Sequence, residues 1–80
     1  MQLTNLPIGK TARIIQLNAK EIKRRRFLDL GLVPGTVVVA KRRSPSGDPT
    51  AFLIRGTTIA LRKEETDLII VQEMGQKKII

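Results

Sequence analysis

Short apolar runs recur along this chain, and turn-forming residues separate them. Alternation of apolar and polar side chains predicts a first strand over residues 10–17. A run of three valines favours extended backbone, because branched side chains pack well on a pleated surface, and it predicts a second strand over residues 36–42. Later strands are expected over residues 50–55, 57–61 and 68–72.

One helix is predicted between the first two strands, over residues 20–30. Its apolar side chains fall on one broad arc at about 100° per residue. They are Ala19, Ile22, Phe27 and Leu30. Asn18 is the expected N-cap, and Glu21 would complete a capping box with it. Gly31 suits the left-handed residue that closes a helix, because it has no Cβ to clash there.

Turn chemistry accounts for most of the remaining residues. A Pro-Gly pair predicts a type II turn before the second strand, and residues 44–49 are dense in turn formers and predict a loop. The residues expected to shape these turns are Pro34, Gly35, Gly47, Asp48, Pro49 and Gly56. Residues 63–66 are expected to form one helical turn. Residues 74–80 have no hydrophobic period, and we expect them to form a mobile C-terminal tail.

Five short strands in a chain of 80 residues favour one domain, over residues 1–73, with a mainly β fold. An open sheet of this size would leave exposed edges and too little core, so a closed or nearly closed small barrel is predicted, with the helix capping one end. The core is expected to be aliphatic, because the chain holds two Phe and no Trp or Tyr.

The net charge of +8 is confined to the first half of the chain. Residues 1–43 hold ten Lys or Arg and two Asp or Glu, whereas residues 44–80 hold five of each kind. Such a field attracts nucleic acid, anionic lipid or an acidic protein surface. No apolar run approaches the roughly 20 residues of a membrane span, and no signal-peptide pattern is present, so we expect a cytoplasmic location.

Several segments together resemble the FeoA family, the small cytoplasmic component of bacterial ferrous iron uptake. They are RFLDLGL at 26–32, Pro-Gly at 34–35, Pro45 with Gly-Asp-Pro at 47–49, Arg-Gly at 55–56 and IALR at 59–62. The resemblance implies an SH3-like barrel, similar also to the C-terminal domain of iron-dependent repressors. It implies a partner as well, the FeoB-type ferrous iron permease with its cytoplasmic GTPase domain, which would bring the protein to the inner face of the membrane.

Catalytic and metal-binding chemistry finds little support in the residue types. The chain has no His and no Cys, so the usual ligands of Zn²⁺ or Fe²⁺ and the usual general bases are missing. The clustered carboxylates Glu64, Glu65 and Asp67 are interpreted as a solvated turn that Lys63 partly neutralises. We therefore expect no catalytic residue, no metal site and no cofactor.

Binding to another macromolecule is the function that remains. The candidate partner-binding residues are Arg24, Arg25, Arg42 and Arg43. We expect an interaction module that binds the cytoplasmic part of the FeoB-type permease. The alternatives are a regulatory domain like that of the repressors, a solvated charged face, or a nucleic-acid binder. Single-strand binders use aromatic platforms, however, and both Phe are expected to be buried.

Overall fold

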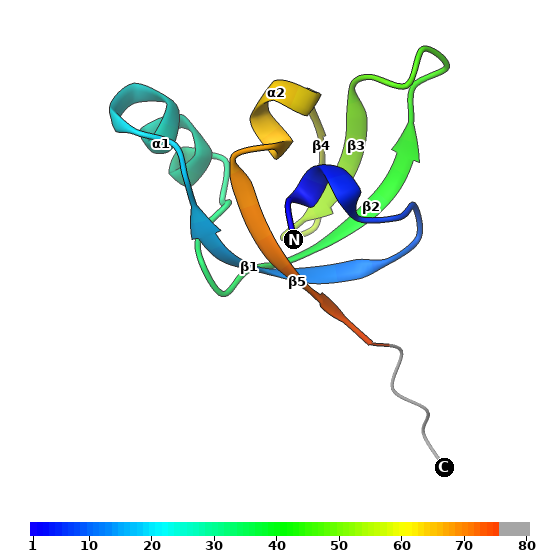
Figure 1. Cartoon of the computed structure of the whole chain (residues 1–80), viewed down its shortest axis with the longest axis horizontal. Helices are drawn as coiled ribbons and strands as arrows, with labels where there is room; N and C mark the ends of the chain where they lie inside the picture. The colour runs from blue at the N-terminus through cyan, green and yellow to red at the C-terminus, as the bar shows by residue number, and fades with distance from the viewer. Residues whose placement is uncertain (76–80) are drawn as a thin grey trace.

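The computed structural model describes residues 1–75, which form one strongly curved sheet with helices at its ends (Figure 1). The elements in chain order are η1 (Leu3–Asn5), β1 (Thr11–Leu17), α1 (Glu21–Asp29), β2 (Val37–Arg43), β3 (Thr50–Ile54), β4 (Thr57–Leu61), α2 (Lys63–Thr66) and β5 (Ile69–Met74). Among the described residues five strands are present, and the one longer helix lies between the first and second. The predicted mainly β class is confirmed.

All neighbouring strands are antiparallel, in the order β4-β3-β2-β1-β5. The pairing register shifts between Ile14 and Gln16 in β1, and between Ala40 and Arg42 in β2. Such irregularities bend a strand and increase its local twist. They allow a small sheet to wrap around its own core.

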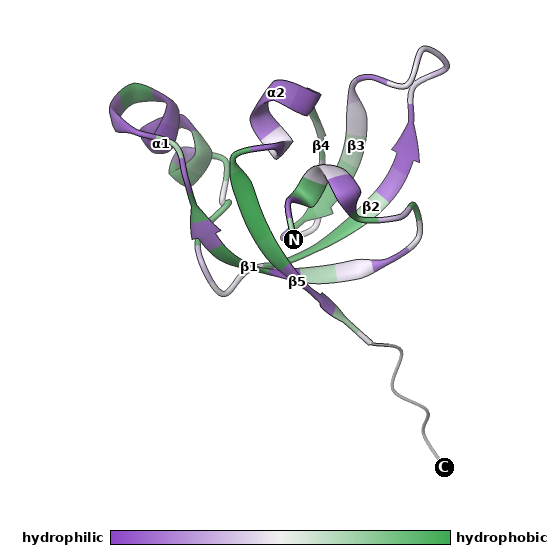
Figure 2. Ribbon diagram, viewed as in Figure 1, coloured by the Kyte–Doolittle hydropathy of each residue, from purple (hydrophilic) through white to green (hydrophobic). Residues whose placement is uncertain are grey.

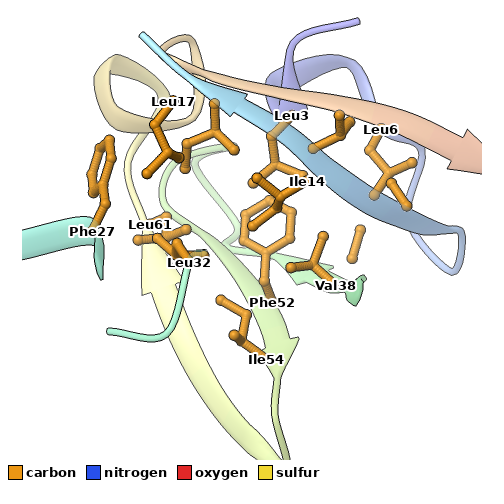
Figure 3. Close-up of a cluster of buried hydrophobic side chains, with 14 of the residues drawn as sticks. Leu3, Leu6, Ile14, Leu17, Phe27, Leu32, Val38, Phe52, Ile54 and Leu61 are labelled. Atoms are coloured by element: carbon orange, nitrogen blue, oxygen red, sulfur yellow. The ribbon is translucent and has the colours of Figure 1, made fainter. Parts of the chain in front are cut away.

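The core lies inside this curved sheet and consists of aliphatic side chains and the two Phe. Figure 3 shows Phe52 in the middle of the cluster and Phe27 at its edge. Leu3 and Leu6 also belong to the core, at exposures of 0% and 2%. The sequence patterns indicated no element there. Residues three apart align in a 3₁₀ turn, so one short turn at η1 directs both leucines inward.

Strand β5 continues farther than the sequence predicts. Met74 lies opposite Thr11 in the β1–β5 ladder, so the expected tail does not begin at residue 74. Backbone pairing with β1 extends the strand, although its last residues carry no apolar period. Residues 76–80, the rest of the predicted tail, lie outside the described residues.

The end of α1 is a hydrogen-bonded turn built on Gly31. Gly31 has φ +92°, and its N–H donates to the carbonyl of Leu28 at 3.0 Å. The N–H of Leu32 donates to the carbonyl of Phe27 at 2.9 Å. These two bonds make a Schellman motif, which satisfies the last carbonyls of the helix, and both Phe27 and Leu32 are buried in the core.

Substitution of Gly31 tests the need for this left-handed residue. We expect Gly31→Val to lower the free energy of unfolding by at least ~1 kcal/mol, because a branched side chain is strained at this φ. A Cβ at this position would also lie 3.1 Å from Cδ of Arg55. Thermal and urea unfolding measure the loss.

Gly75→Val is the matched control for that measurement. Gly75 is not in the left-handed region, and a Cβ there would meet no heavy atom within 4 Å. The control should unfold like the parent protein. Equal stability of the Gly31 variant would contradict the role given to this turn.

Candidate interaction surfaces

Helix α1 stands out from the barrel and is held mainly by its last turn. Of its nine residues Phe27 is the one buried side chain. Ile22 is 86% exposed, so its predicted place on the buried arc is wrong. The helix meets the core only near its C-terminal end, where Phe27 and Leu30 pack, and its first turns project into solvent.

The predicted capping box of α1 is also wrong. The N-cap is Lys20, which makes no side-chain capping bond, and Glu21 has φ +48°. Asn18 instead belongs to the strand pairing: its N–H donates to the carbonyl of Leu68 at 2.7 Å, and its side-chain oxygen accepts from Nε2 of Gln16 at 2.7 Å. Pairing with the chain ahead of β5 therefore takes precedence over the local capping motif.

The basic side chains of α1 differ in what they contact. Arg26 forms an ion pair with Glu65 of α2. Arg24 reaches the carbonyl of Leu17 at 3.4 Å, a long hydrogen bond. Arg25 is exposed and makes no side-chain hydrogen bond or ion pair within residues 1–75. The free positive charge of the helix is thus concentrated on its solvent side, and Figure 2 shows α1 as largely hydrophilic.

Arg42 and Arg43 lie elsewhere, at the end of β2 beside the β2–β3 loop. Both are exposed. Figure 1 shows this loop and α1 on opposite sides of the molecule. The structure therefore does not bring the four candidate arginines together. It separates them into a helix pair, Arg24 and Arg25, and a strand pair, Arg42 and Arg43.

The loop at residues 44–49 is a compact structural unit. The N–H of Ser44 donates to the carbonyl of Pro49 at 3.0 Å, and Gly47 has φ +93°. The Oδ1 atom of Asp48 accepts the N–H of Lys63 at 2.8 Å, which connects the loop to the start of α2. Asp48 also lies 3.9 Å from the Arg62 guanidinium.

The remaining turn residues form two tight turns, one before β2 and one between β3 and β4. Thr36 N–H donates to the carbonyl of Val33 at 2.9 Å across Pro34 and Gly35, and Gly35 has φ +98°, as a type II turn requires. Arg55 and Gly56, at φ +51° and +82°, form the two-residue turn between β3 and β4.

A hollow of about 220 Å³ lies between η1, α2 and the β2–β3 loop. Its lining residues are Thr4, Leu6, Arg43, Gly47, Asp48, Thr50, Phe52, Lys63 and Thr66.

Beside this hollow the Oγ1 atoms of Thr4 and Thr66 lie 2.6 Å apart. Thr4 also donates to the Asp67 carboxylate, and Nζ of Lys63 lies 3.1 Å from Oδ2 of Asp67. The Thr4 hydroxyl first and the Lys63 ammonium second lower the pKa of Asp67 below its ordinary value.

Two of the three clustered carboxylates have different partners, and the third, Glu64, is exposed. Glu65 pairs with Arg26 and accepts the N–H of Arg62 at 3.0 Å, whereas Asp67 faces Thr4 and Lys63. Among residues 1–75 no group of three carboxylates is placed to hold a metal ion. Neither helix in this part of the chain has the length and apolar character of a membrane span.

Two solved structures share this architecture. The solution structure of FeoA from Chlorobium tepidum is 32% identical at a TM-score of 0.88, and the match covers 98% of this chain and 74% of that one. Zinc-complexed FeoA from Stenotrophomonas maltophilia, described as a prokaryotic SH3 domain protein, is 29% identical at a TM-score of 0.80. That match covers 90% of this chain and 89% of the other. The fold is therefore that of a small SH3-like domain.

The sequence comparison identifies the family of this chain among SH3-like domains. The FeoA domain family matches residues 1–73, and the chain belongs to this family. A longer relative is the Fe(2+) transport protein A/Fe(2+) transporter FeoB fusion protein of Porphyromonas gingivalis, 29% identical over 72 residues. The match covers 90% of this chain, which spans about 8% of that protein's length.

Acid unfolding tests the bonds around Asp67. Because its pKa is lower in the folded than in the unfolded chain, Asp67 stabilises the fold above its ordinary pKa of about 4. This contribution is lost as the pH falls through the lower folded value. Asp67→Asn should melt below the parent at pH 7, and the difference should narrow as the pH falls below about 4.

Glu64→Gln is the control, since Glu64 is exposed on the same turn and makes no side-chain hydrogen bond within the described residues. Its melting temperature should follow that of the parent across the titration. A difference for Asp67→Asn that persists unchanged to pH 2 would contradict the charge-based explanation.

Proposed function

We propose that this protein is a non-catalytic accessory module of ferrous iron uptake that binds the cytoplasmic part of a FeoB-type permease. Membership of the FeoA family supports the link to iron transport. The relative from Porphyromonas gingivalis supports the link to the permease, because it carries both parts in one chain. Joining two chains makes their contact intramolecular and raises the effective concentration of each part at the other. Such a fusion favours parts that act together. The protein would work at the inner face of the membrane through this partner.

The exposed side of α1 is the contact surface that the geometry supports best. The helix is anchored by Phe27, and Ile22, Arg24 and Arg25 remain exposed to solvent. Ile22 and Arg25 line the same shallow hollow on this side of α1, so an apolar side chain and a positive charge lie together there. An acidic protein surface with a small apolar pocket would cover Ile22 and neutralise the arginines, and charge complementarity would speed the encounter.

The absence of an aromatic platform disfavours nucleic acid as the target. Phe27 and Phe52, the two aromatic residues of the sequence, are 0% and 2% exposed. Stacking on a single strand needs exposed rings. The helix charge therefore fits a protein partner better than a nucleic acid.

Charge reversal on α1 tests this proposal. The double variant Arg24→Glu, Arg25→Glu should lose most of its binding to the immobilised cytoplasmic region of a FeoB-type permease. The two new negative charges would face acidic groups of the partner, so attraction would become repulsion. Binding is measured by pull-down and by titration at two salt concentrations. A thermal melt of each variant shows that it is folded.

The control is Lys10→Glu, Lys41→Glu, which changes the net charge equally, from +8 to +4, because each exchange removes two units. Both lysines are exposed on the barrel, outside α1. If the helix makes the contact, this control should retain most of its affinity. Unchanged binding of the α1 variant would remove the helix from the interface.

A further inference from the structure

The outer edge of β4 carries backbone groups that pair with no other strand among residues 1–75. Strand β4 ends the sheet order, and its five residues pair with β3 alone. The two-residue turn closes a hydrogen-bonded pair between Ile54 and Thr57, so the alternation of an antiparallel ladder points the N–H and C=O groups of Thr58 and Ala60 away from β3. Within residues 1–75 no other backbone or side-chain group bonds to them.

The other edge of the sheet differs in this respect. The N–H of Val71 in β5 donates to the carbonyl of Met1 at 2.7 Å, and Gln2 bridges to Ile70. Part of β5 is therefore covered by the chain itself. Strand β4 also lacks the features that protect an edge: its sequence TTIAL has no charge and no proline, and its register with β3 is unbroken.

A shallow hollow of about 490 Å³ lies on the outer face beside this edge. Its floor includes Ala51 and Ala60, which are opposite each other in the β3–β4 ladder. Arg42 is opposite Ala51 in the β2–β3 ladder. One row thus runs from the free edge across two small side chains to an arginine. A strand added to β4 would place its next residue in the same row, three strand spacings or about 14 Å from Arg42. The extended side chains of Arg42 and a glutamate together span that distance across the alanines.

We propose that the β4 edge binds an extended acidic segment of another protein by strand addition. The backbone of Thr58 and Ala60 supplies the pairing, and Arg42 selects a carboxylate at the position beside Ala60. Arg55 and Arg62 border the strand at its two ends and favour acidic flanks as well. This proposal is independent of the α1 contact, because it concerns a different face of the barrel.

Charge also argues against a second copy of this chain as the occupant. Antiparallel pairing of two β4 strands about Ile59 would place Arg55 of each copy beside Lys63 of the other. Like charges in facing positions are destabilising in a sheet. The same ends attract glutamates or aspartates of a different chain.

The test uses two synthetic peptides, ETVEVTE and KTVKVTK, titrated into ¹⁵N-labelled protein. The acidic peptide should shift the amide signals of residues 57–61, Ala51 and Arg42 saturably and slow hydrogen exchange at Thr58 and Ala60. The basic peptide should bind at least about tenfold more weakly, since its charges would repel Arg42, Arg55 and Arg62 instead of attracting them. No shift at β4 with millimolar acidic peptide, or equal shifts with both peptides, would overturn the proposal.

Ala60→Pro tests the backbone contact, because proline removes an N–H that faces solvent and is tolerated on an edge strand. It should abolish peptide binding, whereas Thr58→Val, which keeps the backbone groups, should not. Arg42→Glu provides a second readout that does not depend on the fold of the proline variant, and it should favour the basic peptide. β4 shifts that depend on protein concentration rather than on peptide would identify a second copy as the occupant and contradict the proposal.

Discussion

Helix α1 is positioned by the burial of one aromatic ring. Phe27 is fully buried, and the Schellman motif at Gly31 joins its carbonyl to the N–H of Leu32, which is fully buried as well. Burial of such a side chain contributes about 1.5–3 kcal/mol. The same geometry leaves the other helical side chains outside the core. The fold can therefore anchor a basic helix through one buried residue, while the rest of the helix stays in solvent.

The short helix α2 connects the outer parts of the molecule. Glu65 pairs with Arg26 of α1, Asp67 accepts from Thr4 of η1, and the N–H of Lys63 binds Asp48 of the β2–β3 loop. Single hydrogen bonds and ion pairs contribute modestly to stability, so these contacts fix the relative positions of the elements but do not by themselves hold the barrel together. The aliphatic core inside the sheet has that role.

The strands and turns could be predicted from the sequence because their signals are local: branched residues, Pro34 with Gly35, and Gly31 after the helix. Four features could not be predicted, since each depends on contacts distant in sequence. Pairing near Leu68 recruits Asn18 away from the helix, and β1 extends β5 to Met74. Docking by the last helical turn exposes Ile22, and η1 buries Leu3 and Leu6 without any strand period.

The candidate site shows the same division. The sequence identified the basic residues and predicted a helix for one pair and a strand end for the other, but it did not show that the two pairs lie on opposite sides of the molecule. The open edge of β4 had no signal in charge or motif. An edge strand is defined by its place in the sheet order, which becomes visible only once all strands are paired.

In the proposed complex the exposed side of α1 contacts the permease while the barrel behind it stays unchanged. Amide chemical shifts of labelled protein, recorded during titration with the cytoplasmic region of a FeoB-type permease, test this most directly. We predict shifts at Ile22, Arg24 and Arg25, with the inner strand residues Ala12 and Val38 unmoved. Shifts confined to the barrel, with α1 silent, would contradict it.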